Sequence, residues 1–290
     1  MSDDIAKAGV IGGGLMGSGI AEVCARAGLD VLVVETTPAT LDAARARIET
    51  SLSRSVDKGK LSADDHAAAL ARIAYTLDLT DCADRDLVVE AVAENGRLKA
   101  EVFAELDKVV ARPDAILASN TSSIPITKIA TATTRPEYVV GIHFFNPVPV
   151  LPLVEIIPSV LTSDDTAQRA TAFAGDVLGK TVVRAPDRSG FVVNALLIPY
   201  LLSAVRMLEA GVATAEDIDA GMVNGCAHPM GPLRLADLIG LDTTKAVADS
   251  MYEEFKEPLY AAPPLLLRMV DAGLYGKKSG RGFYDYRKVG

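Results

Sequence analysis

The chain has 290 residues, 49% of them hydrophobic and 23% charged, which is long enough to bury two modest hydrophobic cores. Its net charge of −9 argues against a nucleic-acid-binding surface. Three cysteines without a CxxC spacing and three histidines without an HExxH motif indicate neither a disulfide framework nor a metal site.

The sequence predicts a cytoplasmic protein that does not insert into a membrane. Residues 1–4 are acidic at two positions and lead into an apolar strand, without the charged and apolar regions of a signal peptide. The longest apolar run, 191–205, contains Asn194 and Pro199 and is shorter than the ~20 residues that a membrane span needs. We expect this run to form a core or interface helix.

The first 35 residues predict a strand, a helix and a second strand. An apolar strand at 8–11 enters the glycine loop 12–17, a helix follows at 18–27, and a buried strand at 30–34 ends at Glu35. Such a unit opens a doubly wound, Rossmann-type sheet that binds a dinucleotide.

The glycines of this loop match that chemistry. Gly12 permits the tight turn, Gly14 lets a pyrophosphate approach the backbone, and Gly17 lets the helix pack on the strand. Glu35 lies 18 residues beyond Gly17, where a carboxylate binds a ribose diol. The alternative, a glycine-rich turn in another α/β protein, leaves Glu35 unexplained.

The alternation of strands and helices continues to about residue 186, and a purely helical pattern follows. We expect residues 1–186 to form the sheet domain and 187–290 an all-helical domain, with the boundary in the charged segment 184–190, which contains Pro and Gly. The further predicted elements of the first domain are a helix at 41–55 with a basic face, strands at 73–79 and 87–92, a helix at 94–110, and strands at 115–117 and 139–142.

Polar side chains follow the apolar strands of this domain. Residues 118–123 carry four hydroxyls, among them Ser122, and an amide, directly after a strand. Ligands of an open α/β sheet bind at the carboxyl ends of its strands, so this loop is expected to face the cofactor. The alternative is a cluster that caps a helix N-terminus.

A histidine and a glutamate form the candidate catalytic pair. His143 ends a strand, and Glu155 lies within an apolar run, where an unpaired charge is costly. A chain reversal in the proline-rich segment 147–152 would set Glu155 opposite His143 and prepare the ring for acid–base work. Alone, His143 is better explained by a structural role.

Six motifs in order resemble the L-3-hydroxyacyl-CoA dehydrogenase family, and within it the stand-alone bacterial 3-hydroxybutyryl-CoA enzymes. The resemblance spans nearly the whole chain. The motifs are GGGLMG at 12–17, NTSS at 120–123, HFFNP at 143–147, GFVVN at 190–194, PMGP at 229–232 and KKSGRGFY at 277–284.

The resemblance implies NAD as cofactor, an acyl-CoA substrate and a homodimer formed through the helical domain. The implied catalytic residues are His143, Glu155, Ser122 and Asn194. The cofactor-binding residues are Gly12, Gly14, Leu15, Met16, Gly17, Glu35, Glu94, Lys99, Ser122, Asn146 and Lys278, and the substrate-binding residues are Ser51, Lys58, Ser122 and Asn194.

The chain departs from the family pattern at two positions. Ser189 replaces a proline that usually precedes the glycine–phenylalanine pair, and Gly96 interrupts the first turn after Glu94. Arg54, Lys58 and Lys60 suit a coenzyme A phosphate, because a phosphate needs cations in an acidic protein. An ordinary solvated helix face explains Arg54 and Lys60 equally well.

We therefore expect a reversible, NAD-dependent oxidation of an (S)-3-hydroxyacyl-CoA, of short chain, in fatty acid or butanoate metabolism. His143 would take the hydroxyl proton while a hydride leaves C3. Because Asn194 belongs to the helical domain, we expect the site to lie in a cleft between the domains. The alternatives are a dehydrogenase for another acyl-CoA such as 3-hydroxyadipyl-CoA, one for a small hydroxy or sugar acid, and a non-catalytic relative.

Overall fold

The computed structural model describes residues 5–287, and the chain divides into two compact units, Met1–Arg188 and Ser189–Gly290. The acidic residues 1–4, on which the expectation about a signal peptide partly depended, lie outside the described residues. The division falls within the segment 184–190 in which the sequence places the domain boundary. Each unit is described by itself below.

The first unit contains an eight-stranded sheet in the order β3-β2-β1-β4-β5-β6-β7-β8. Its pairs are parallel except for β6 and β7, which run antiparallel. The strands are β1 (Lys7–Ile11), β2 (Asp30–Val34), β3 (Ile73–Thr76), β4 (Leu87–Glu90), β5 (Ile116–Ser119), β6 (Val139–Phe144), β7 (Leu153–Pro158) and β8 (Thr181–Arg184). The order reverses direction at β1 and β4, which is the switch point where such sheets bind ligands.

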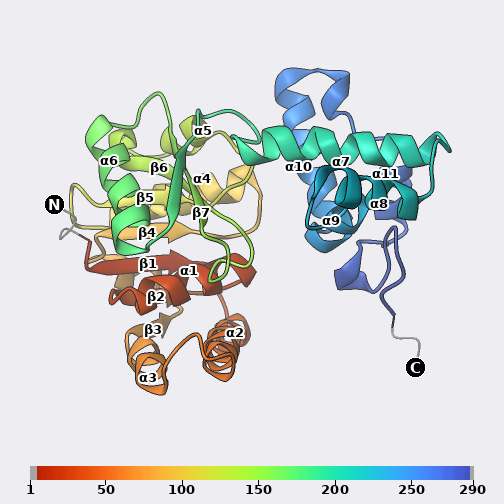
Figure 1. Ribbon diagram of the computed structural model, residues 1–290. Coiled ribbons are helices and arrows are strands. Elements are labelled where there is room, and N and C mark those ends of the chain that lie inside the picture. Colours follow the sequence, from red (N-terminus) through yellow and green to blue (C-terminus); the bar gives the residue numbers. More distant parts are fainter. Residues whose placement is uncertain (1–4, 288–290) are drawn as a thin grey trace. The chain divides into compact units, whose positions relative to one another are not determined.

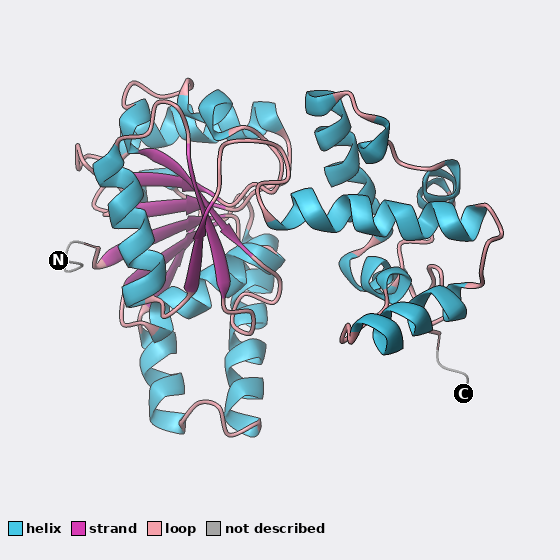
Figure 2. Ribbon diagram, turned by 45° about the horizontal axis from the view of Figure 1, so that its top comes forward, coloured by secondary structure: helices cyan, strands magenta, loops and turns pink. Residues whose placement is uncertain are grey.

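Helices pack against this sheet, and two of them form a hairpin that projects beyond β3 (Figures 1 and 2). The hairpin helices are α2 (Pro38–Asp57) and α3 (Ala63–Ala71), and the other helices of the unit are α1 (Leu15–Arg26), α4 (Gly96–Val109), α5 (Ile126–Ala130) and α6 (Asp164–Ala172). A capping box between Thr37 and Thr40, with Pro38 in the first turn, starts α2. The strand interiors are almost fully buried, and α1 and α2 cover them.

The second unit is helical, apart from two isolated β-bridges in the segment 276–285. Its helices are α7 (Val193–Glu209), α8 (Ala215–Cys226), α9 (Pro232–Ile239), α10 (Leu241–Phe255) and α11 (Pro264–Asp271). They enclose a separate core around Leu201, Leu233, Met251 and Leu266. The predicted fold, a Rossmann-type sheet followed by a helical domain, is confirmed.

Element ends differ from the prediction where side chains bond to the backbone. The strand expected to reach residue 79 stops at Thr76, because the Asp78 carboxylate accepts the N–H of Thr80 at 2.9 Å and starts a 3-10 turn, η1 (Leu79–Cys82). The helix expected from residue 94 begins at Gly96, because the side chain of Asn95 caps it. Gly96 is therefore the first helical residue and not an interruption.

The helices α3, α5 and α6 and the strand β8 of the first unit have no counterpart in the sequence prediction. Both α3 and α6 begin with a serine whose hydroxyl accepts a backbone N–H three residues later, Ser62 from Asp65 and Ser163 from Thr166. That cap pattern was readable in the sequence.

Among residues 5–287, no helix is both long and apolar enough to cross a membrane.

Candidate active site

His143 lies between a hydroxyl and a carboxylate. β6 and β7 pair in a register that places His143 opposite Glu155, and the His143 Nδ1 is 2.8 Å from the Glu155 Oε2. On its other side, the His143 Nε2 is 3.1 Å from the Ser122 Oγ. His143 is 4% exposed and Glu155 fully buried. A carboxylate at Nδ1 fixes the tautomer in which Nδ1 donates and Nε2 is the acceptor.

The loop that carries Ser122 is held by Glu94. The Glu94 Oε1 accepts hydrogen bonds from the Thr121 hydroxyl at 2.5 Å and from the N–H groups of Ser122 and Ser123 at 3.0 and 3.2 Å. The Asn120 Oδ1 accepts the N–H of Phe144 at 2.9 Å, which ties the same loop to β6. The hydroxyl residues do not cap α5, whose N-cap position is Pro125. The loop is thus fixed beside His143.

A buried ion pair between Lys99 and Glu90 lies next to Glu94 and holds it in place. The Lys99 Nζ lies 2.7 Å from the Glu90 Oε1 and 3.4 Å from the Glu94 Oε2. The second oxygen of Glu90 accepts the Ser119 hydroxyl at 2.7 Å. Lys99 is 1% exposed and Glu90 fully buried. The sequence prediction placed Lys99 and Glu94 at the cofactor and missed Glu90, although an acid at the end of an apolar strand was a visible signal.

The glycine loop and Glu35 meet at the end of β2. Gly12 has a φ of +92°, and a Cβ on Gly17 would lie 1.8 Å from the Gly12 oxygen, so the turn requires both glycines. The Glu35 Oε1 accepts the N–H of Gly13 at 2.6 Å. Leu15 is exposed and Met16 half-buried at the start of α1, whose first N–H groups have no helical partner.

A pocket of about 600 Å³ lies beside this loop. Its lining combines glycines, one carboxylate and apolar side chains, including Gly12, Gly14, Glu35, Leu77, Leu79 and Leu98. Such a lining fits an adenosine, with the apolar side chains against the base and Glu35 toward the ribose hydroxyls. The residues present therefore fit a dinucleotide.

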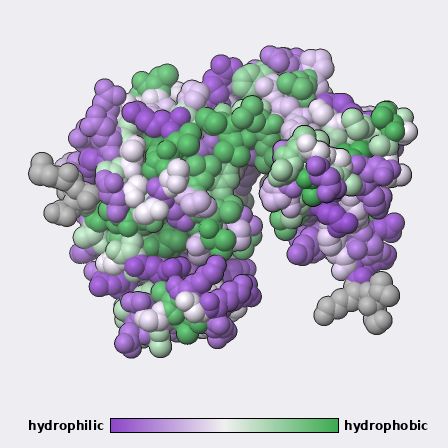
Figure 3. All heavy atoms as spheres, viewed as in Figure 1, coloured by the Kyte–Doolittle hydropathy of each residue, from purple (hydrophilic) through white to green (hydrophobic). Residues whose placement is uncertain are grey.

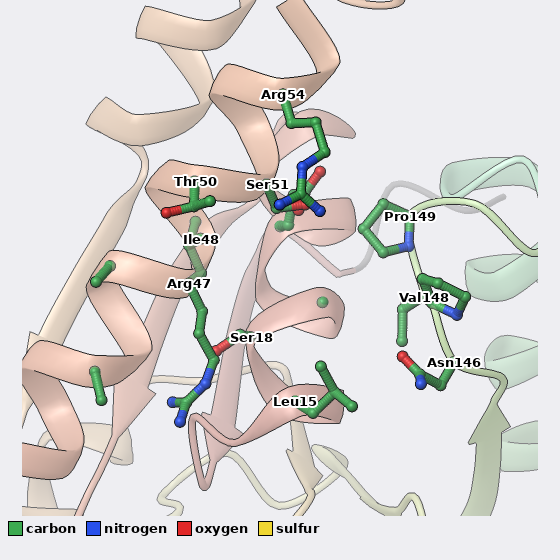
Figure 4. A pocket seen from close by; sticks show the side chains of 15 residues that line it. Leu15, Ser18, Arg47, Ile48, Thr50, Ser51, Arg54, Asn146, Val148 and Pro149 are labelled. Atoms are coloured by element: carbon green, nitrogen blue, oxygen red, sulfur yellow. The ribbon is translucent and has the colours of Figure 1, made fainter. Parts of the chain in front are cut away.

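A second pocket, of about 700 Å³, lies between α1, α2 and the loop after β6 (Figure 4). We call it the α1–α2 groove. Its lining includes Leu15, Ser18, Glu22, Ser51, Arg54 and Asn146. Of the predicted substrate residues, Ser51 lines the groove, whereas Lys58 caps the C-terminus of α2, one turn beyond Arg54. The predicted cofactor residue Asn146 is at its other side.

The remaining predicted residues lie in the second unit. Asn194 is the second residue of α7 and is half-buried. The Lys278 Nζ forms an ion pair of 2.6 Å with Asp242 and is half-exposed. Ser189, which replaces the family proline, is 2% exposed and donates its N–H to the Glu254 Oε2 at 2.8 Å. The serine is therefore fixed by hydrogen bonds at the start of this unit.

Comparisons with known proteins agree with these features. Residues 7–188 match the sequence family described as the 3-hydroxyacyl-CoA dehydrogenase NAD-binding domain, and residues 190–286 match the C-terminal domain of the same family. A 3-hydroxybutyryl-CoA dehydrogenase of Mycobacterium tuberculosis is 62% identical over 99% of this chain and 100% of its own length.

Solved structures give the same picture. The crystal structure of M. tuberculosis FadB2 superposes with a TM-score of 0.97 at 61% identity, over 98% of this chain and 100% of the other. That of the (S)-3-hydroxybutyryl-CoA dehydrogenase PaaH1 from Ralstonia eutropha gives a TM-score of 0.93 at 45% identity, with the same coverage.

Proposed function

The chain belongs to the 3-hydroxyacyl-CoA dehydrogenase family, and we propose that its substrate is the short-chain (S)-3-hydroxybutyryl-CoA, which it converts reversibly to acetoacetyl-CoA. The chain is an NAD-dependent oxidoreductase. What we propose beyond the family is the short length of the acyl group. It is supported by full-length similarity to relatives whose names include this substrate.

The observation that carries the proposed mechanism is the position of His143 between Ser122 and Glu155. In oxidation, the Nε2 of His143 takes the proton of the substrate hydroxyl as the C3–H bond breaks and a C=O bond forms. NAD⁺, when bound, supplies the acceptor for the hydride that leaves C3. The Glu155 carboxylate, 2.8 Å from Nδ1, then stabilises the imidazolium. In the reverse direction His143 returns this proton to the oxygen.

Ser122 and Asn194 are proposed to hold the substrate oxygen. The Ser122 hydroxyl already points to the Nε2 of His143, so an oxygen bound near both groups would lie within hydrogen-bond distance of the base. Glu94 fixes the backbone of this serine through two N–H groups of the loop. Asn194 is proposed for the same oxygen from the family resemblance.

The residues proposed to hold the cofactor are those of the glycine loop, Glu35, Asn146 and Lys278. Glu35 is followed by Thr36 and Thr37 without an adjacent arginine, so a ribose 2′-phosphate would meet a carboxylate. We therefore expect a higher kcat/KM with NADH than with NADPH. Equal values would show that Glu35 does not read the ribose.

The α1–α2 groove is proposed to take the coenzyme A part of the substrate. Ser51 and Arg54 line it, and Lys58 follows one turn later at the C-terminus of α2. The α2–α3 hairpin carries many hydrophilic residues on the face seen in Figure 3. If Lys58 contacts the nucleotide phosphate, Lys58→Ala should raise KM for the CoA thioester but not for a pantetheine thioester. An equal rise for both would place Lys58 on a solvated face.

We propose that the chain works in the cytoplasm as a homodimer formed through its second unit. Several large apolar side chains of this unit are exposed, including Leu196 at 74% and Val212 at 69%. Such exposure on one small helical unit favours an interface with a second copy. Light scattering at micromolar concentration tests this, and a monomer would contradict it.

An absorbance assay of NADH oxidation tests the substrate proposal. Acetoacetyl-CoA should give the highest kcat/KM among 3-ketoacyl-CoA thioesters of increasing length. A higher value with 3-ketoadipyl-CoA, or with a free small keto acid, would replace the proposal with one of the two enzymatic alternatives. Absence of turnover with all of them would favour a non-catalytic relative.

A further inference from the structure

Glu22 is a buried acid that the proposed mechanism does not use. It lies on α1, one turn beyond Ser18 and Gly19, on the helix face that lines the α1–α2 groove. Its side chain is 1% exposed. The Glu22 Oε1 lies 3.5 Å from the Arg26 Nη1, and the Oε2 has no hydrogen-bond partner among the described residues. Buried polar atoms normally have a hydrogen-bond partner, so a bound ligand is a candidate partner for this oxygen.

The surroundings of Glu22 favour its neutral form. Burial raises the pKa of the Glu22 carboxyl, while the nearby Ser51 hydroxyl and the charges of Arg26 and Lys180 act in the opposite direction without cancelling it. A neutral carboxyl carries both an O–H donor and a carbonyl acceptor. It therefore offers the two kinds of hydrogen bond that an amide group needs.

The wall opposite Glu22 is fixed. A Cβ on Gly19 would come within 2.9 Å of the Val148 Cβ, which shows how closely the loop after β6 approaches α1. The Lys180 Nζ holds this loop by donating to the carbonyl oxygens of Val148 and Leu151, at 2.6 and 2.8 Å. The groove is therefore bounded by rigid elements on the side where the loop meets α1.

The groove has the composition expected for a flexible arm that contains amides. Apolar residues of α2 and the loop, such as Ala43, Ala46 and Pro149, alternate with uncharged polar side chains, and Arg47 and Arg54 add two cations. A phosphorylated ligand would be repelled by a carboxylate at Glu22 but not by a neutral carboxyl. A pantetheine arm, with two amides and a hydroxyl between the thioester and the phosphates, meets these conditions.

We propose that the Glu22 carboxyl is a substrate-binding group that hydrogen-bonds the pantoyl hydroxyl or the adjoining pantoyl–β-alanine amide of the pantetheine arm in the α1–α2 groove. This inference rests on the proposed function, because it requires the groove to take the acyl thioester. It adds to that function a residue whose role is binding and not chemistry. Glu22 should therefore affect KM of the arm-bearing substrates and leave kcat unchanged.

The first test compares Glu22→Gln and Glu22→Leu on three acetoacetyl thioesters: that of CoA, that of pantetheine, and that of N-acetylcysteamine, which lacks the pantothenate part. Loss of one hydrogen bond corresponds to about a 2- to 10-fold change in binding. Glu22→Leu should raise KM by about this factor for the first two and not for the third. The KM for NADH should not change. Glu49→Gln, on an exposed position of α2 outside the groove, is the matched control for loss of one charge.

The second test uses pH, because glutamine is neutral at every pH. As pH rises through the pKa of Glu22, which burial holds above the ordinary carboxyl value, the wild-type side chain ionises and its KM for acetoacetyl-CoA should increase. In Glu22→Gln this increase should be absent, while any limb of kcat that depends on His143 persists. The charged groups that act on Glu22 are Arg26 of its own helix and Lys180 beside the loop after β6.

Three results would overturn the proposal. An equal effect of Glu22→Leu on all three thioesters would indicate general loosening of the groove. A KM that matches the wild type for both variants would show that the arm does not reach Glu22. A shift in NADH binding instead would assign Glu22 to α1 packing, and thermal melting of both variants checks the fold.

Failure of the proposed function is distinguishable from these results. Calorimetric titration of the whole protein with CoA, which needs no turnover, measures binding to the groove directly. If CoA binds and Glu22→Leu weakens it while the chain reduces no ketoacyl thioester, the substrate proposal fails and the Glu22 assignment stands. If CoA does not bind at all, both fail.

Discussion

Both units bury carboxylates, but they use them differently. In the first unit, the buried Glu155 is bonded to the ring of His143, and Glu94, whose side chain is 39% exposed, is bonded to the loop that carries Ser122. In the second unit, Asp219 and Asp237 are bonded mainly to backbone N–H groups. The acids of the first unit therefore support side chains of the candidate site, His143 among them, whereas those of the second unit mainly hold the backbone in place.

The two aspartates of the second unit hold its C-terminal segment in place. The Asp237 oxygens accept the N–H groups of Phe283 and Tyr284 at 2.9 and 3.0 Å. Asp219 accepts the hydroxyl of Tyr284 at 2.8 Å as well as two N–H groups at the start of α9. A Cβ on Gly282 would lie 2.0 Å from the Asp237 Oδ1, so the approach of this segment requires glycine.

The difference shows that a buried acid is not by itself evidence of a site. A carboxylate whose acceptors are filled by backbone donors has no proton to move and no free face for a ligand. A carboxylate bonded to an imidazole, which in turn faces a hydroxyl, can support acid–base chemistry. The partners, and not the burial, separate the two cases, and each of the following substitutions tests one of them.

The largest effect is expected for His143→Gln. Removal of a positioned acid–base group typically lowers the rate by ~10²–10⁴. We expect a fall in kcat of this size with acetoacetyl-CoA and NADH, with the NADH dissociation constant nearly unchanged, as measured by fluorescence titration. Activity close to the wild type would return His143 to a structural role, as with the aspartates of the second unit.

Glu155→Gln should lower kcat by a smaller factor, up to about 10². The amide keeps the shape of the side chain but lacks the charge that stabilises the imidazolium. Because groups that act as one unit are not additive, the double variant with His143→Gln should be little slower than His143→Gln alone. Multiplicative losses in steady-state kinetics would show that the two side chains act independently.

The sequence predicted two parts of the site in detail: the nucleotide-binding loop within the first 35 residues, and the pair of His143 and Glu155. The glycine loop and Glu35 are local, because strand, turn, helix and acid follow one another within 35 residues. The opposition of His143 and Glu155 was predictable because the proline-rich connection between them is short enough to force a reversal. Local sequence sets each of these contacts.

Contacts between distant elements were not predictable in the same way. Glu90 meets Lys99 of α4 and Ser119 of β5, and no pattern within one segment indicates that these three groups converge. Lys180 binds a loop about thirty residues earlier in the chain, and Glu22 looks like any acid on a helix until α2 and the loop cover it. Only the order of the strands brings such groups together.

Lys99→Met tests whether this lysine supports the site from within. Breaking a buried ion pair by removing one partner typically costs about 3–5 kcal/mol, because the Glu90 and Glu94 charges lose their cation. We expect a fall in unfolding free energy of this size together with a lower kcat, since Glu94 positions the Ser122 loop. Denaturant unfolding measures the first and the NADH assay the second.

Lys278→Met provides the control for that experiment. Its ion pair with Asp242 is half-exposed, and such pairs contribute about 0–1 kcal/mol. Its unfolding free energy should therefore stay close to that of the wild type. If Lys99→Met were equally stable, the buried network would not depend on its lysine, and a direct contact of Lys99 with the cofactor would become the better explanation of any loss in activity.

The smallest effect concerns Asp237, whose variant should lose stability without losing chemistry. Asp237→Asn retains one acceptor oxygen and leaves one of the two backbone N–H groups facing an amide donor, at a cost of about 1–3 kcal/mol.

Burial raises the pKa of Asp237, although the N–H groups of Phe283 and Tyr284 oppose the shift. A carboxyl with a raised pKa stabilises the fold most where it is protonated, and this contribution is lost as pH rises from the unfolded value through the folded one. The gap in unfolding free energy between wild type and Asp237→Asn should therefore widen as pH falls from 7 toward 4.

For Asp86 of the first unit, we expect a pH dependence of the unfolding free energy that is opposite in sign to that for Asp237. Burial opposes its ionised form, but the N–H groups of Lys7 and Ala6 and the charge of Arg112 outweigh it and hold the pKa of Asp86 below its ordinary value. The gap between wild type and Asp86→Asn should therefore stay nearly constant from pH 7 to about 5 and narrow as the pH falls further, through the unfolded aspartate value of about 3.9, because a carboxyl with a lowered pKa loses its contribution only below that value. Urea unfolding of both variants at several pH values measures the two slopes. Slopes of the same sign would mean that solvation, and not the set of hydrogen-bond partners, decides how these buried acids contribute.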